Sequence, residues 1–291
     1  MHREVVQIAA RSTCEREEFL MIAGGANRVH ECGRRREKFV KDLVKGLMRS
    51  LGLDTALNAP QLDDARFQDL SFERRQIVEG VKPFTMATDE RIVSLINAVD
   101  YISENKLVGD IAECGVWRGG SMMAVALALL ARGDVTRELW LYDTFEGMSE
   151  PTDYDRTFDG RTARSELERT PPATGIWCHA TVEEVERNIF STDYPHDKIH
   201  FVKGKVEQTL PSRMPSRLSL LRLDTDWYES TKHELIHLFP VLEIGGILIL
   251  DDYGHWQGAR KAVDEFFQER GEIPYLHRVD YTCRTAVKTH G

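Results

Sequence analysis

Two apolar runs in the final third of the sequence constrain the fold more than any other feature. The first run ends in the acidic pair Asp224 and Asp226, and the second, which contains a Gly-Gly pair, ends in Asp251 and Asp252. Apolar runs of this length, bounded by polar residues, are typical of buried parallel strands. Residues 230–242, between the runs, carry apolar side chains at helical spacing. This segment therefore predicts a strand, a helix and a second strand joined by a right-handed crossover.

Both acidic pairs are expected at one edge of the sheet, because strands joined by such a crossover point the same way. In open α/β sheets, ligands bind at this carboxyl edge. Carboxylates that converge there repel one another unless a cation or a shared proton relieves the repulsion. Since oxygen-only ligand sets favour a hard ion, the two acidic pairs indicate a magnesium site.

Strand and helix signals alternate over much of the remaining chain. Apolar runs predict strands at residues 110–116, 139–143 and 198–203, and apolar stripes predict helices at residues 89–104, 122–130 and 258–268. Residues 278–288 are interpreted as a terminal strand or hairpin. This alternation predicts an α/β fold with a doubly wound, mostly parallel sheet.

Two segments fall outside the alternation. Residues 1–80 contain no strand-like run, and apolar residues recur every four positions from Phe39, which predicts an amphipathic helix. We interpret residues 1–80 as a helical N-terminal cap with a loosely ordered beginning, and residues 81–291 as the main domain. The loop at residues 144–180 is rich in Asp, Thr, Pro and Gly. A structureless stretch of that length is usually functional, so we expect a lid.

Charge and cysteine content exclude several classes of protein. The formal net charge of −9 argues against a nucleic-acid partner, which requires a basic surface. The five cysteines are scattered without Cys-x-x-Cys spacing, which fits reduced thiols in the cytoplasm. The first residues lack the apolar core of a signal peptide, and no apolar run approaches the ~20 residues that span a bilayer. We therefore expect a cytoplasmic protein without a membrane partner.

The turn after the first predicted strand has features of a nucleoside-cofactor site. Its glycines, beginning at Gly115, have G-x-x-x-G-G spacing and not the G-x-G-x-x-G spacing of dinucleotide enzymes. Ser121 is placed to cap the next helix, and Asp143 ends the next strand, where an acid can accept the ribose hydroxyls. Glu113 would repel a diphosphate but could pair with the amino group of a methionine-like moiety. These residues favour S-adenosylmethionine over NAD.

Six sequence motifs, spread in order over residues 80–270, carry a resemblance to a known family. They are Lys-Pro-Phe-Thr-Met at 82–86, Gly-Asp-Ile-Ala-Glu-Cys-Gly-Val-Trp-Arg-Gly-Gly-Ser-Met-Met at 109–123, Tyr-Asp-Thr-Phe-Glu-Gly-Met at 142–148, Leu-Arg-Leu-Asp-Thr-Asp-Trp-Tyr-Glu-Ser-Thr at 221–231, Gly-Gly at 245–246 through Asp-Asp-Tyr at 251–253, and Ala-Val-Asp-Glu-Phe at 262–266. The sequence thereby resembles the macrocin O-methyltransferase family, whose members methylate sugar hydroxyls on macrolide and aminocoumarin antibiotics.

The resemblance implies a Rossmann-like sheet of the class I methyltransferase type, S-adenosylmethionine, Mg²⁺ and a homodimer or higher homo-oligomer. It implies that Asp224, Asp251 and Asp252 bind the metal, with Asp226 as the next candidate for a base or for orienting the substrate. The residues assigned to the cofactor site are Thr85, Met86, Glu113, Gly115, Ser121, Asp143, Thr144 and Gly204.

The sequence departs from the family pattern in two places. The residue between Asp224 and Asp226 is often Gly in the family but is Thr225 here, and we expect its side chain to point away from the acids. The N-terminal segment is also longer than the family predicts, so we expect a remodelled acceptor surface.

The predicted chemistry is methyl transfer to one hydroxyl of a vicinal diol on a sugar of a glycosylated natural product. A sugar hydroxyl is a poor nucleophile until it is deprotonated, and a metal that holds it lowers its pKa. Asp224 and Asp226 share a face of the strand roughly 7 Å apart, and either is a candidate to take the proton.

Several alternatives stay open at this point. A catechol-type or other small-molecule O-methyltransferase would use the same metal chemistry. An NAD-linked oxidoreductase is disfavoured by the glycine spacing, and a catalytically silent nucleoside-binding protein is disfavoured by the acidic cluster. His233 and His237 have helical metal spacing, but without an apparent third ligand a zinc site is disfavoured.

Overall fold

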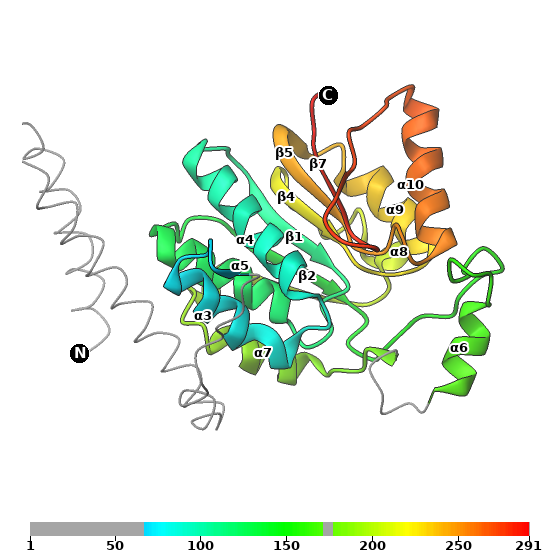
Figure 1. The fold of residues 1–291 in the computed structure, drawn as a ribbon, viewed down its shortest axis with the longest axis horizontal. Coiled ribbons are helices and arrows are strands. Elements are labelled where there is room, and N and C mark those ends of the chain that lie inside the picture. Colours follow the sequence, from blue (N-terminus) through cyan, green and yellow to red (C-terminus); the bar gives the residue numbers. More distant parts are fainter. Residues whose placement is uncertain (1–66, 171–176, 291) are drawn as a thin grey trace, which may run out of the picture. The chain divides into compact units, whose positions relative to one another are not determined.

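A seven-stranded sheet organises the computed structural model, which describes residues 67–170 and 177–290 (Figure 1). The strand order is β3-β2-β1-β4-β5-β7-β6. The parallel strands are β1 (Asp110–Cys114), β2 (Leu139–Asp143), β3 (Ile199–Lys203), β4 (Leu218–Leu223) and β5 (Leu242–Leu250). The terminal hairpin of β6 (His277–Arg278) and β7 (Arg284–Val287) adds to β5 in antiparallel fashion. The prediction of a doubly wound, mostly parallel sheet is confirmed.

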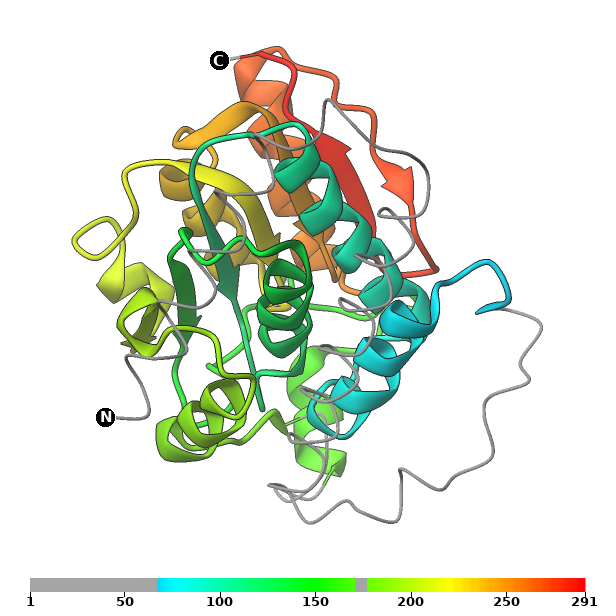
Figure 2. The same ribbon diagram turned by 90° about the vertical axis from the view of Figure 1, so that its left-hand side faces the viewer.

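Helices cover both faces of the sheet. One face packs with α3 (Phe72–Val81), α4 (Asp89–Glu104), α5 (Gly120–Arg132) and α7 (Val182–Phe190), and the other with α8 (Val206–Thr209), α9 (Tyr228–Leu238) and α10 (Gln257–Arg270). In Figure 2, α4 and α5 lie in front of the strands and α10 lies behind them. Successive strand side chains point to opposite faces, so Leu220 joins the first core and Leu221 the second. Burial on both faces explains why the strands are continuous apolar runs.

Local chemistry sets where several helices begin. The hydroxyls of Ser71, Thr88 and Thr181 each accept a backbone N–H at the start of α3, α4 and α7. Such caps satisfy donors that have no partner in the first helical turn. The predicted cap at Ser121 is wrong, because α5 starts at Gly120, after Gly119 in a left-handed conformation, and Ser121 lies inside the helix.

Two further boundaries differ from the sequence predictions. The helix predicted at residues 230–242 ends at Leu238, and Leu242 already belongs to β5. Pro240 accounts for the early end, because proline has no N–H to continue the helical hydrogen-bond pattern, although Phe239 before it still has helical backbone angles. The 144–180 loop is also not structureless, because α6 (Ala163–Arg169) begins at a Thr162 cap within it. Short 3₁₀ turns occupy η4 (Lys82–Phe84) and η6 (His196–Lys198).

The N-terminal cap is described only from residue 67, so the helix predicted from Phe39 lies outside the described residues. Helix α3 places Ile77 and Val81 in the same core as α4 and α5. The domain boundary near residue 80 stays a prediction. Within the described ranges, no helix has the length and apolar character required to cross a membrane.

Candidate active site

A cavity of about 440 Å³ lies at the carboxyl ends of β1, β2, β4 and β5. Its walls include every residue that the sequence assigned to cofactor, metal or base: Thr85, Met86, Glu113, Gly115, Ser121, Asp143, Thr144, Gly204, Asp224, Asp226, Asp251 and Asp252. Ligand pockets for small molecules have this size. The roles of these residues stay predictions, but segments far apart in sequence do meet around one cavity.

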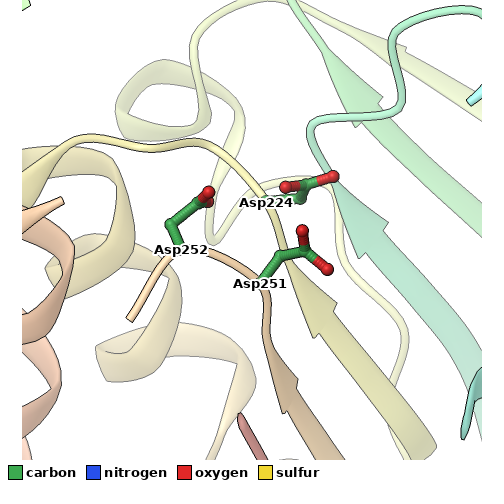
Figure 3. Close-up of side chains that lie close together, drawn as sticks. All are labelled: Asp224, Asp251 and Asp252. Carbon is green, nitrogen blue, oxygen red and sulfur yellow. The ribbon is translucent and has the colours of Figure 1, made fainter. Parts of the chain in front are cut away.

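Three carboxylates converge where β4 and β5 end. Asp224, Asp251 and Asp252 turn their side chains toward one another (Figure 3), with one oxygen of each within 4.8 Å of the others. The Asp251 N–H donates to the Leu223 carbonyl at 2.9 Å, which holds the two strand ends together. Within the described part of the chain, this is the one group of three acidic, histidine or cysteine residues that meets so closely. The His233–His237 pair is therefore without a third ligand there.

Burial and the charges of neighbouring acids make the charged forms of Asp224 and Asp252 costly. Burial raises the pKa of Asp224 well above its usual range, against the lowering effect of Arg222. Burial and the charges of Asp226 and Asp251 likewise raise the pKa of Asp252. The Asp224 side chain nevertheless keeps 29% of its surface accessible. A divalent cation would relieve this repulsion, and carboxylate oxygens are ligands that Mg²⁺ prefers.

Arg222, which sequence analysis did not single out, neutralises the base of the cluster. Its guanidinium contacts Glu113, the Asp224 Oδ2 at 2.8 Å and the Asp251 Oδ1 at 2.7 Å. Glu113 and Arg222 are register partners on β1 and β4. The signal was present in the sequence, because an arginine inside an apolar strand requires buried acidic partners.

Arg91 is a second arginine that sequence analysis missed. From α4, its Nη1 contacts the Asp251 Oδ2 at 2.5 Å and its Nε contacts the Asp280 Oδ2 at 2.6 Å. Asp280 lies in the turn between β6 and β7. Arg91 therefore connects the last hairpin to the carboxylate cluster, although it lies 160 residues before Asp251 in the sequence. Spacing along the chain gives no signal for such a contact.

Glu113 lines the cavity with only one of its two carboxylate oxygens paired among the described residues. It is 1% exposed, and Arg222 contacts its Oε1. Its Oε2 is buried without a hydrogen-bond partner among the described residues. Burial raises the pKa of Glu113 to about 7, and the charge of Arg222 opposes the rise. A buried acceptor of this kind is expected to find a donor when a ligand fills the cavity.

Asp143 ties together the turns that follow β1 and β2. Its Oδ2 accepts the N–H groups of Val116 and Trp117 at 2.8 and 3.1 Å, and its Oδ1 accepts the Phe145 N–H at 2.8 Å. The position of this acid was predicted from the sequence, but these hydrogen bonds were not. A carboxylate has about four acceptor sites, so most of its capacity is used within the protein. Its role toward ribose stays a prediction.

Aromatic residues border the cavity near Asp252. His255 and Tyr281 line the cavity and hydrogen-bond to each other, and the Phe158 ring lies 5.9 and 6.0 Å from theirs. We call Phe158, His255 and Tyr281 the aromatic rim. Phe158 is 61% exposed and Tyr281 is 46% exposed. Trp227, by contrast, is buried and donates to the Ser149 carbonyl, so it packs beneath the 144–180 loop.

The fold and the site define a class I methyltransferase. The chain is similar to the solved structure of the O-methyltransferase NovP, with a TM-score of 0.66 and 25% identity over 88% of this chain and 100% of that one. The fold is also shared with the calicheamicin methyltransferase CalS11, with a TM-score of 0.53 and 16% identity over 85% of this chain and 91% of that one.

The macrocin-O-methyltransferase family model matches residues 40–287, so the chain belongs to that family. It is an S-adenosylmethionine-dependent O-methyltransferase. The match extends beyond residues 80–270, over which the sequence motifs carried the resemblance.

Three curated relatives align with this chain at 32–33% identity over 182–198 residues. The 8-demethyl-8-(2,3-dimethoxy-alpha-L-rhamnosyl)-tetracenomycin-C 4'-O-methyltransferase of Streptomyces olivaceus is 33% identical over 198 residues, which cover 68% of this chain and 73% of the relative. The mycinamicin III 3''-O-methyltransferase of Micromonospora griseorubida is 32% identical over 196 residues, covering 67% and 75%. The demethyldecarbamoylnovobiocin O-methyltransferase of Streptomyces niveus is 32% identical over 182 residues, covering 62% and 67%.

Proposed function

We propose that this enzyme methylates one hydroxyl of a sugar diol in a glycosylated natural product, with S-adenosylmethionine as donor and Mg²⁺ at the carboxylate cluster. The observation that carries the proposal is the convergence of Asp224, Asp251 and Asp252 in the same cavity as Glu113. The three relatives support the acceptor class, because their names describe transfer to rhamnosyl-tetracenomycin, a novobiocin precursor and mycinamicin.

The residues present fit the cofactor. In this proposal, the buried Oε2 of Glu113 accepts a hydrogen bond from the amino group of the methionine moiety. Thr85, Met86 and Ser121 line the same cavity, and Gly115 and Gly204 are positions in its wall that have no side chain. The charge of Glu113 also disfavours the diphosphate of NAD.

The residues present also fit the metal. One oxygen of each of the three carboxylates lies within 4.8 Å of the others, so these residues would hold a Mg²⁺ between them. Bound S-adenosylmethionine supplies the methyl group, and bound Mg²⁺ supplies a Lewis acid that lowers the pKa of a sugar hydroxyl. Arg222 and Arg91 hold Asp251 in place from both of its oxygens.

Asp226 is the residue that we assign to take the proton, with Asp224 kept as a metal ligand. Asp226 borders the cavity but stands outside the group of three carboxylates. Burial, followed by the charge of Asp224, raises the pKa of Asp226 to about 7. A general base is most effective when its pKa lies near the working pH. Asp226 can therefore accept a proton at its carboxylate under neutral conditions.

The aromatic rim is the surface that we assign to the acceptor. Phe158 and Tyr281 expose ring surface next to His255, which lines the cavity. Exposed aromatic rings next to a polar site suit a ligand that has a hydroxyl-bearing sugar and an apolar body. The homo-oligomer that the family resemblance implies is proposed along with this function, and light scattering of the full chain tests it.

Calorimetric binding of S-adenosylhomocysteine tests the cofactor, with NAD⁺ as the control ligand and with Mg²⁺ present or absent. We expect micromolar binding of S-adenosylhomocysteine and none of NAD⁺. Glu113→Gln is expected to weaken binding of S-adenosylhomocysteine, while Glu243→Gln, at a carboxylate outside the cavity, leaves it unchanged. Binding of NAD⁺ in place of S-adenosylhomocysteine, or of neither, would contradict the proposed cofactor site.

Turnover then tests the acceptor class. A panel of glycosides with vicinal sugar diols, free sugars and simple catechols is offered with S-adenosylmethionine and Mg²⁺. Methylation of the glycosides, abolished by a chelator, is the expected result. Preference for the catechols would replace the proposed acceptor with that of a catechol-type enzyme.

A further inference from the structure

A strained three-residue turn carries Asp226 between β4 and α9. The Trp227 N–H donates to the Thr225 carbonyl at 2.7 Å, and Asp226, in the middle, has a φ of +65°. Left-handed conformations are costly for residues other than glycine, although aspartate tolerates them better than most. Turns closed in this way are rare, and they persist where the surrounding structure holds them.

A buried carboxyl on α9 holds this turn. The Thr225 hydroxyl donates to the Glu234 Oε1 at 2.9 Å, and Glu234 is fully buried. Burial raises the pKa of Glu234 well above its usual range, which disfavours its charged form. The Thr225 side chain thus points toward helix α9. This contact fixes the first residue of the turn to a rigid element.

The three-residue turn at Asp226 orients one carboxylate of the cluster. The Asp226 N–H donates to the Asp252 Oδ2 at 3.2 Å. Asp224 is held separately, because its N–H donates to the Cys114 carbonyl at 2.8 Å. A change in the turn is therefore transmitted to Asp252 while Asp224 keeps its attachment to β1.

We propose that the Thr225–Glu234 hydrogen bond positions the Asp226 turn so that its N–H fixes Asp252 for a divalent cation. This inference rests on the metal site of the proposed function. Thr225 and Glu234 are positioning residues that act through the turn. Hydrogen bonds that orient metal ligands commonly change metal affinity by tenfold or more when they are lost.

The test measures Mn²⁺ binding, by electron paramagnetic resonance, to the full chain and its variants. Thr225→Val keeps the β-branched shape but removes the hydroxyl, and we expect it to weaken Mn²⁺ binding about tenfold. Glu234→Leu removes the other partner and is expected to act in the same direction. Thr225→Ser and Glu234→Gln keep a donor and an acceptor, so both are expected to stay within about twofold of the wild type.

Two controls separate positioning from general loss of structure. S-adenosylhomocysteine binding is expected to be unchanged in Thr225→Val, because Glu113 and Asp143 lie on other strands. Thr192→Val removes a buried threonine hydroxyl that donates to the Ile189 carbonyl, away from the cavity, and is expected to leave Mn²⁺ affinity unchanged.

The outcomes distinguish the inference from the proposed function. If the wild type binds Mn²⁺ and Thr225→Val binds it equally well, the inference is wrong and the metal site stands. If Thr225→Ser loses as much affinity as Thr225→Val, the hydroxyl is not the cause and the inference is also wrong. If the wild type binds no divalent cation, the metal site and the inference fail together.

Discussion

Gly115 shows how a single residue without a side chain permits the site. A Cβ at this position would lie 2.0 Å from the Asp224 carbonyl oxygen, and the backbone φ is +81°. Gly115→Ala is therefore expected to displace Asp224 from the cluster. The loss of stability should exceed the roughly 1–2 kcal/mol that a left-handed conformation alone costs, because steric overlap adds to it. Urea unfolding measures the loss.

Gly133→Ala is the matched control for this substitution. Gly133 has a φ of +70°, but among the described residues outside its own helix and chain neighbours no heavy atom would lie within 4 Å of a Cβ there. Its replacement is expected to cost about 1–2 kcal/mol and to leave the cavity intact. Equal losses at the two glycines would refute the steric account of Gly115.

At the scale of elements, Arg222 joins β4 to the strands on either side of it. Arg222→Met leaves Glu113, Asp224 and Asp251 buried without their shared counter-charge. We expect a loss of about 3–5 kcal/mol in the free energy of unfolding, the usual consequence of breaking a buried ion pair. The measurement is urea unfolding in the presence of EDTA.

Arg217→Met provides a surface comparison for Arg222→Met. Arg217, just before the start of β4, has a side chain that is 55% exposed and pairs with Glu243 on β5. An exposed pair of this kind contributes about 0–1 kcal/mol. A large loss at Arg217, or a negligible one at Arg222, would be inconsistent with the assignment of Arg222 as the counter-charge of the cluster.

The 144–180 loop is attached to α9 through Asp155. This residue is 1% exposed, and its carboxylate accepts the Tyr228 N–H at 2.8 Å and the Thr152 N–H at 2.6 Å. Asp155→Ala is expected to release the loop and to speed its cleavage by trypsin at Arg156 and neighbouring arginines. Asp153→Ala, at an exposed position of the same loop, is the control. Unchanged cleavage in Asp155→Ala would mean that other contacts hold the loop.

The elements that could be predicted from the sequence are those with an apolar pattern that repeats along their whole length. The helix at 89–104 and the strand at 139–143 were predicted with the bounds that the structure shows, because their apolar pattern runs the full length of each element. The end of α9 was missed because a proline overrides an apolar pattern that continues past it. The contacts of Arg91 were missed because they join segments that only the folded chain brings together.

The acidic residues of the site could be placed from sequence because parallel strands bring their carboxyl ends to one edge. Asp224 and Asp251 are neighbours for that reason, and all the predicted residues line one cavity. The internal bonds of Asp143 were not foreseen, because backbone donors from two turns leave no signature in residue types.

For the whole molecule, the buried carboxyls link stability to pH. Burial raises the pKa of both Glu113 and Asp226 to about 7. Between their ordinary pKa values, near 4, and about 7, the folded protein binds more protons than the unfolded chain. Stability of the metal-free protein therefore falls as pH rises through this interval. The melting temperature in EDTA should be higher at pH 5.5 than at pH 7.5, and Asp226→Asn should reduce the difference.

Added Mg²⁺ is expected to oppose the fall in stability with rising pH. Ligand carboxyls must be deprotonated to bind a cation, so the rise in melting temperature on addition of Mg²⁺ should be larger at pH 7.5 than at pH 5.5. Asp251→Asn should abolish the rise, whereas Asp264→Asn, at a surface carboxylate on α10, should preserve it. A Mg²⁺ effect that is the same at both pH values would argue against cation binding by these carboxyls.

Phe158 of the aromatic rim lies in the 144–180 loop, whereas the acids lie at the strand ends, with His255 just after β5 and Tyr281 between β6 and β7. Under the proposed function, substitutions in the loop change which molecule is accepted and leave the transfer chemistry in place. Such an enzyme is free to diversify, because changes in the loop around Phe158 can adapt a lineage to a new glycoside while the strand ends are inherited unaltered.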